Sequence, residues 1–151
     1  MNQESVTATR DPRTDVSDLS FRSLFRTTRL GAHAARHAAE RWLADRLSPE
    51  EPGDGDLAAT ASLLIAELAA NAALHGHVRG REARLVVVLD ATELRVEVTD
   101  ARGDDLPVKC TERGGESGRG LFLVEALADD WGVLPYTPGG KTVWAMCRRC
   151  Q

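Results

Sequence analysis

The amino-acid sequence predicts an α+β fold: a two-layer α/β sandwich whose mixed, mostly antiparallel sheet carries its helices on one face. Two β-branched runs, 83–90 and 93–100, are separated only by Ala91-Thr92, which is typical of a β-hairpin. Two stretches upstream, 32–47 and 57–75, have apolar residues at helical spacing. With the elements below, the order is strand, helix, helix, two strands, loop, helix, two strands, which suits one sheet covered on one side.

The first of these elements is expected at residues 19–30, where Phe and Thr in a mixed apolar and polar run favour an edge strand. Gly31 is expected to break that strand before the first helix, 32–47, which Ser48-Pro49 ends. Residues 1–18 are polar and without periodicity, so we expect a disordered arm followed by one domain over 19–151.

The second helix is expected over 57–75, with Asp56 as its N-cap and Gly76 as the glycine that closes it. Residues 101–118 are rich in glycine and charge and too irregular for a core element. Helical periodicity returns over 119–129, and the runs 131–136 and 141–147 are the last two expected strands.

Length and charge exclude several classes of protein. The chain of 151 residues suffices for one domain, and its formal net charge of −4 argues against nucleic acid as the main partner and against a polybasic membrane anchor. No run approaches eighteen consecutive apolar residues, and the first residues lack the apolar core of a secretory signal, so we expect a cytoplasmic protein. Three cysteines build no disulfide framework, and we interpret Cys147 and Cys150 as small residues at the end of the last strand and its tail.

A polar line on the second helix is the first candidate for chemistry. Glu67, Asn71 and His75 are spaced four residues apart, which places them on one helical face beside the apolar stripe. A solvated helix face would explain this pattern equally well, but an asparagine inside a helix is weakly favoured and tips the interpretation toward function. A carboxylate and a carboxamide oxygen one turn apart can serve a magnesium–phosphate centre, and the carboxylate can also accept a proton.

The second candidate is Asp100, which ends the strand LRVEVTD and precedes a glycine-rich segment. The segment GESGRGL opens the third expected helix, and backbone amides at a helix N-terminus bind phosphate readily. This is neither a dinucleotide-binding fingerprint nor a Walker A loop, because the required third glycine and GK[ST] ending are missing. The fragment GGKT at 139–142 lies between two strands, so it is rejected as a phosphate loop on context.

Together these pieces resemble the Bergerat-fold ATPases and kinases, which include type II topoisomerase ATPases, large heat-shock chaperones and sensor histidine kinases. ELAANAALHG is similar to their N-box, VTDARGDDLP to the aspartate box that binds adenine, GGESGRGLFLVEALADDWGV to the second glycine box, and GGKTVWA to the final strand pair. The resemblance covers roughly 19–147. Size and order of parts are most similar to the anti-sigma factor serine kinases.

The resemblance implies ATP and Mg²⁺ as cofactors. Asn71 would coordinate the Mg²⁺ bridging the phosphates, and Glu67 would be the general base that activates the acceptor hydroxyl. Asp100 would accept a hydrogen bond from the adenine amino group, supported by Thr142 from the last strand. Residues 101–118 would form the ATP lid. The remaining nucleotide-binding residues implied are Gly103 in that lid and, at the helix start, Gly118, Arg119 and Gly120.

The resemblance also implies partners: an anti-sigma-factor antagonist protein that accepts phosphate on serine or threonine, a sigma factor, and a second copy in a homodimer. One departure bears on activity. The family pattern Asp-x-Gly-x-Gly reads Asp100-Ala101-Arg102-Gly103-Asp104 here, with no glycine at either expected position. The leading hypothesis is therefore an ATP-binding protein serine/threonine kinase that sequesters a sigma factor. The alternative is a kinase-inactive binding module of the same fold that regulates by protein contact alone.

Overall fold

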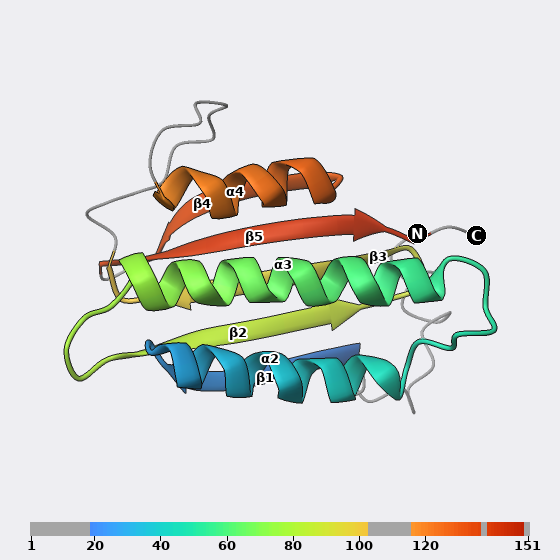
Figure 1. Ribbon diagram of the computed structural model, residues 1–151, viewed down its shortest axis with the longest axis horizontal. Coiled ribbons are helices and arrows are strands. Elements are labelled where there is room, and N and C mark those ends of the chain that lie inside the picture. Colours follow the sequence, from blue (N-terminus) through green and yellow to red (C-terminus); the bar gives the residue numbers. More distant parts are fainter. Residues whose placement is uncertain (1–18, 103–115, 137–138, 150–151) are drawn as a thin grey trace, which may run out of the picture.

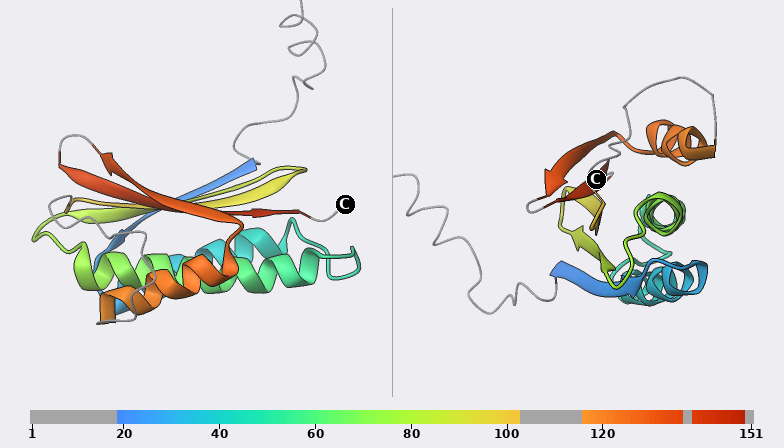
Figure 2. Two further views of the ribbon diagram at one scale, coloured as in Figure 1. Left: turned by 90° about the horizontal axis from the view of Figure 1, so that it is seen from above. Right: turned by 90° about the vertical axis from the view of Figure 1, so that its left-hand side faces the viewer.

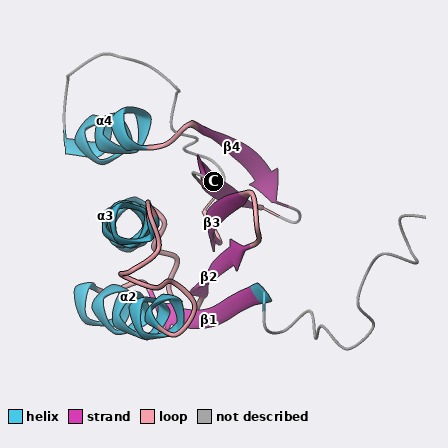
Figure 3. Cartoon of the chain, turned by 90° about the vertical axis from the view of Figure 1, so that its right-hand side faces the viewer, coloured by secondary structure: helices cyan, strands magenta, loops and turns pink. Residues whose placement is uncertain are grey.

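The computed structural model describes residues 19–102, 116–136 and 139–149, with the backbone alone for 116–120. The described chain forms two layers, a five-stranded sheet and three helices that all cover the same face of it (Figures 1 and 2). The end-on view of Figure 3 separates the helix layer from the strand layer and places α3 between α2 and α4. The predicted α+β sandwich with helices on one face is confirmed.

The sheet has the strand order β1-β2-β3-β5-β4. Each neighbouring pair of strands is antiparallel, so the sheet is wholly rather than mostly antiparallel across the described strands. The predicted hairpin is confirmed as β2 and β3. The elements in chain order are β1 (Ser20–Arg26), α2 (Arg29–Ala44), α3 (Asp54–His75), β2 (Glu82–Leu89), β3 (Glu93–Asp100), α4 (Glu116–Leu127), β4 (Asp130–Tyr136) and β5 (Gly140–Arg148).

Strand alternation decides which side chains enter the core, because successive residues of a strand point to opposite faces of the sheet. In β3 the side chains of Leu94, Val96 and Val98 are buried, whereas Arg95 and Glu97 on the other face are only partly covered. The apolar residues pack against the helix stripe of α3, which includes Leu64 and Leu68. Burial of this apolar surface between the layers is the main stabilising term.

Two predictions about the first strand and helix are wrong. The strand ends at Arg26 rather than continuing to 30, because Thr28 caps α2: its side-chain oxygen accepts the Gly31 N–H at 3.0 Å. Gly31 lies inside the first turn of α2 instead of breaking a strand. A side chain there would collide with the backbone of Arg26, since a Cβ would lie 3.0 Å from the Arg26 carbonyl carbon. The glycine therefore permits the tight strand-to-helix turn.

The long central helix α3 begins three residues earlier than predicted, at Asp54 rather than 57. Gly53 is its N-cap with φ of 86°, a left-handed conformation that favours glycine, so Asp56 is not the cap but lies in the first turn with Asp54. The helix ends at His75 before Gly76, as predicted. By length and composition alone α3 is apolar enough to span a membrane, with a mean hydropathy of 1.6. Its apolar stripe is nevertheless covered by the sheet, as expected of the core helix of a domain.

The C-terminal elements follow the predicted order with shifted ends. The third helix runs over Glu116–Leu127 rather than 119–129, and the last strand extends over Gly140–Arg148. Cys147 lies in that strand with its thiol buried, and burial raises the pKa of this thiol. Residues 1–18, predicted as an arm, and Cys150 lie outside the described residues, as does most of the predicted lid.

Candidate functional site

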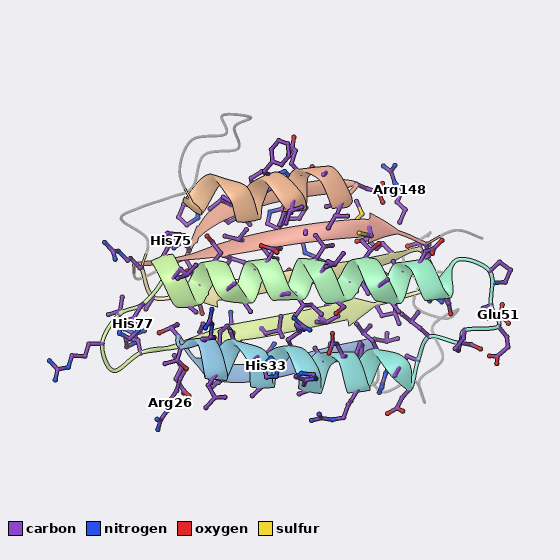
Figure 4. All side chains as sticks on the ribbon, viewed as in Figure 1. Arg26, His33, Glu51, His75, His77 and Arg148 are labelled. Atoms are coloured by element: carbon purple, nitrogen blue, oxygen red, sulfur yellow. The ribbon has the colours of Figure 1, made fainter. Side chains whose placement is uncertain are left out.

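The polar line predicted on the second helix lies on α3 along the side that faces α4. The opposite flank of α3 carries Ser62, whose hydroxyl donates a hydrogen bond to the Glu40 carboxylate of α2. Because a helix turns about 100° per residue, Glu67 and Asn71 lie on the α4 side, roughly 6 Å apart along the axis. α3 packs against α4 as well as α2. His75 continues the line at the C-terminal end of the helix (Figure 4).

The polar side chains of this line have few contacts to other polar groups among the described residues. Within the described part of the chain, neither the carboxylate of Glu67 nor the carboxamide of Asn71 has a hydrogen-bond or ion-pair partner. Asn71 is 9% exposed, so most of its surface is covered by the fold. The Nε2 atom of His75 is likewise buried with no partner among the described residues. Three polar side chains on one face are thus available to a ligand.

Burial also changes the acidity of Glu67. Its carboxylate is partly removed from water and no cation compensates within the described residues, so desolvation raises the pKa of Glu67 above its ordinary value. A carboxylate with a raised pKa accepts a proton more readily once ionised. This is the property required of a general base near neutral pH.

Asp100 ends β3 next to the C-terminal end of α3, and its carboxylate is bound by a lysine. The Lys141 Nζ atom lies 2.9 Å from one carboxylate oxygen and 3.1 Å from the other. The same ammonium donates to the backbone carbonyl of Arg102 at 2.8 Å, and the Arg102 N–H donates to Asp100 Oδ1 at 2.8 Å. Only 2% of the Asp100 side chain and 1% of the Lys141 side chain are exposed.

Two glycines allow this pair to fit between the helix and the sheet. A Cβ on Gly76 would lie 2.5 Å from Asp100 Cγ and closer still to Oδ2, so the helix end touches the carboxylate directly. A Cβ on Gly140 would overlap the backbone carbonyl of Asp100. Both positions require glycine for close approach, and the predicted role of Gly76 in closing α3 is therefore only half of its function.

Thr142 does not support Asp100, which corrects the prediction. In the register of β3 with β5, Asp100 faces Lys141, and Thr99 faces Thr142. The Thr142 hydroxyl bonds to the Thr99 hydroxyl at 2.7 Å on the sheet face without helices. Strand alternation makes this unavoidable, because adjacent residues of one strand point to opposite faces. The residue that reaches Asp100 from the last strand is Lys141.

The predicted phosphate-binding residues are described only in part. Gly118, Arg119 and Gly120 lie among the first five residues of α4, where the structure gives their backbone, and Gly103 lies outside the described residues. The start of α4, the end of α3, the end of β3 and the start of β5 all lie at one end of the domain (Figure 1). The fold therefore brings Asn71, Asp100 and the predicted glycine box to the same end.

The donor set fits a hard divalent cation that also binds phosphate. Among the described residues no group of three or more His, Cys, Asp and Glu side chains could hold a metal. Mg²⁺ needs only one or two protein oxygens when substrate phosphates and waters complete its octahedron. The carboxamide of Asn71 and the carboxylate of Glu67, neither of which has a partner among the described residues, provide oxygens of this kind.

Lys141 is the site residue that sequence reasoning missed. The chain has only two lysines, Lys109 and Lys141, among nineteen basic residues, and this rarity was the available signal. The fragment GGKT is not a phosphate loop by its context, and its last three residues lie at the start of β5. Its lysine has a different function: the ammonium neutralises the buried aspartate on the neighbouring strand.

Comparison with known proteins gives one family. The family model described as histidine kinase-like ATPase domain matches residues 26–147, which is most of the chain and includes α3, Asp100, α4 and Lys141. No curated protein matches the chain.

Proposed function

Because the chain belongs to the histidine kinase-like ATPase domain family, we propose that it is a regulatory ATP-binding protein that transfers phosphate to a serine or threonine of a partner protein. The observation that carries the proposal is the pair of side chains Glu67 and Asn71 on the face of α3 toward α4, for which no partner lies among the described residues.

The residues of α3 divide the chemistry between them. The carboxamide oxygen of Asn71 would hold Mg²⁺, which when bound neutralises phosphate charge and orients the triphosphate. Glu67, one turn earlier, would accept the proton of the attacking hydroxyl. The raised pKa of Glu67 suits that role, because burial without a cation leaves its carboxylate more basic than in water. The backbone amides at the start of α4 would receive phosphate oxygens.

The proposed partners are an anti-sigma-factor antagonist protein, as phosphate acceptor, and a sigma factor that the protein sequesters. Their support is the resemblance of the N-box, aspartate box and glycine box to the anti-sigma factor serine kinases. A second copy of the chain in a homodimer belongs to the same proposal.

A specific observation favours a second candidate, a binding module of the same fold without kinase activity. The carboxylate of Asp100, which would receive the adenine amino group, is already held by Lys141 at 2.9 and 3.1 Å. Arg102 also stands where the family has its first glycine. Such a binding module would contact the same partner proteins but would not transfer phosphate from a nucleotide.

Isothermal titration with Mg-ATP separates the two candidates. The kinase proposal expects binding that falls at least tenfold in Asn71→Ala, because the metal loses its protein ligand. Leu74→Ala is the matched control, since Leu74 lies on the same helix and is 69% exposed. Absence of binding by the unmodified protein, or equal affinity in Asn71→Ala, would contradict the proposal.

Phosphoryl transfer then tests Glu67. Candidate acceptor proteins encoded beside this gene are incubated with the protein and Mg-ATP, and phosphoserine or phosphothreonine is measured by mass spectrometry. Glu67→Gln is expected to retain ATP and to lose transfer by about 10²-fold or more, the usual contribution of a general base. Unchanged transfer would remove Glu67 from that role.

A further inference from the structure

We propose that Lys141 is an internal occupant of the nucleotide-base subsite, and that a base reaches Asp100 only by displacing the Lys141 ammonium. The inference rests on the proposed nucleotide site and specifies how that site is regulated: the protein competes with its own ligand. Its evidence is the coordination of the ammonium, the burial of the pair and the packing around it.

The ammonium is satisfied where it lies. A lysine has three N–H donors. Nζ of Lys141 has three acceptors within 3.1 Å: the two carboxylate oxygens of Asp100 and the carbonyl oxygen of Arg102. The opposite charges are almost completely removed from water, at 1% and 2% exposure. A neutral amino group offers the carboxylate a weaker hydrogen bond than this ammonium does.

Among the described residues, both carboxylate oxygens of Asp100 are in close contact with neighbouring groups. Gly76 at the end of α3 covers Oδ2 closely enough that even a methyl group would not fit between them. Oδ1 accepts from both Lys141 and the Arg102 N–H. A base amino group that is to hydrogen-bond with Asp100 must therefore take the place of the ammonium.

The same contact ties the subsite to the segment after β3. Because Lys141 also holds the Arg102 carbonyl at 2.8 Å, the ammonium fixes the backbone immediately before residue 103 against β5. Displacing Lys141 would release this backbone at the same time. Base binding and release of residues 101–102 are thus coupled through one side chain.

The first test is the affinity of Lys141→Thr for two ligands, measured by isothermal titration. Mg-ATP is expected to bind the variant about tenfold or more tightly than the unmodified protein, the scale of one hydrogen bond to a charged group. Mg-tripolyphosphate, which lacks a base, is expected to bind both proteins equally. Arg148→Thr is the matched control, because it removes a basic residue from the opposite, exposed end of β5 and should leave ATP affinity unchanged.

The second test needs no variant and guards against misfolding of Lys141→Thr, which leaves Asp100 without its counter-charge. The unmodified protein is treated with an amine-acetylating reagent, and acetylation of Lys141 is followed by mass spectrometry against the urea-unfolded protein. Lys141 is expected to be protected in the free protein and at least several-fold more reactive at saturating Mg-ATP. Unchanged protection in the ATP-bound protein would overturn the inference.

The outcomes separate the two proposals. ATP binding by the unmodified protein, with no gain in a folded Lys141→Thr, overturns the inference and leaves the proposed function standing. Binding by Lys141→Thr alone supports the inference and contradicts ATP binding as a function of the unmodified chain. Absence of binding by both folded proteins contradicts both proposals.

Discussion

Replacing Asp100 by asparagine measures how strongly the buried pair stabilises the domain. The substitution keeps the size of the side chain and an acceptor for the Arg102 N–H, but it leaves the Lys141 ammonium without a counter-charge at 1% exposure. Removing one partner of a buried ion pair costs about 3–5 kcal/mol. Domains of this kind are stable by only about 5–15 kcal/mol, so Asp100→Asn is expected to lose a large fraction of the total.

Urea unfolding followed by circular dichroism gives the midpoint and slope from which the loss is calculated. The matched control is Glu97→Gln on the same strand. Glu97 pairs with Arg95 at 2.6 Å, but both side chains are about a third exposed, at 31% and 33%. An exposed pair is worth about 0–1 kcal/mol, so the two variants share a strand and a charge change and differ in burial.

A double replacement completes the argument. Asp100→Leu combined with Lys141→Met removes both charges, and apolar replacement of a buried pair is often neutral or stabilising by about 1–4 kcal/mol. The double variant is therefore expected to be more stable than Asp100→Asn, with strong non-additivity between the two sites. A loss below about 1 kcal/mol in Asp100→Asn, equal to that of Glu97→Gln, would refute the reasoning.

Three further predictions concern the helices. Gly76→Ala is expected to lose about 1–3 kcal/mol by urea unfolding because its Cβ would lie 2.5 Å from Asp100 Cγ, whereas Gly55→Ala in the same helix meets nothing within 4 Å and should not destabilise. Thr28→Ala removes the side-chain oxygen that accepts the Gly31 N–H, so the free energy of unfolding is expected to fall by about 1 kcal/mol in the same assay. An unchanged unfolding midpoint would contradict the role of Thr28 as a cap. Glu67→Gln is expected to be more stable than the unmodified protein at neutral pH. Because the pKa of Glu67 is raised in the folded state, the unfolded state binds fewer protons. The unmodified protein therefore loses stability as the pH rises from 4.5 through the folded pKa. Unfolding curves at pH 4 and pH 7 should show this difference shrinking at the lower pH.

The part of the fold that sequence predicts well is the part decided by periodicity. The alternation in β2 and β3 and the stripe through Leu64 and Leu68 are consequences of burial, and burial leaves a repeating pattern. The helix starts were predicted less well. Thr28 caps α2 through its side-chain oxygen and Gly53 caps α3 through its left-handed backbone with φ of 86°, and neither feature belongs to a periodic pattern.

The site residues also differ in how well the sequence predicts them. Glu67 and Asn71 were found because helical spacing fixes their common face whatever the rest of the fold does. The partner of Asp100 depends on the register between β3 and β5, strands that α4 and β4 separate in the sequence. A shift of one residue exchanges Lys141 for Thr142 and with it an ammonium for a hydroxyl. Sequence reasoning chose the threonine, and only the register corrects that choice.

The two halves of the site are carried by different elements, and this separation has a consequence for ligand selection. Asn71 and Glu67 lie on α3 and would act on phosphates and their cation, whereas Asp100 and Lys141 join β3 to β5 and would meet the base. The first half has no partner among the described residues, whereas the carboxylate of the second half is held by Lys141, so binding energy at the proposed site would come mainly from the phosphate half. Such a site would discriminate nucleotides by phosphate number more than by base. Selectivity for adenine would then appear only when the Lys141 ammonium has left Asp100.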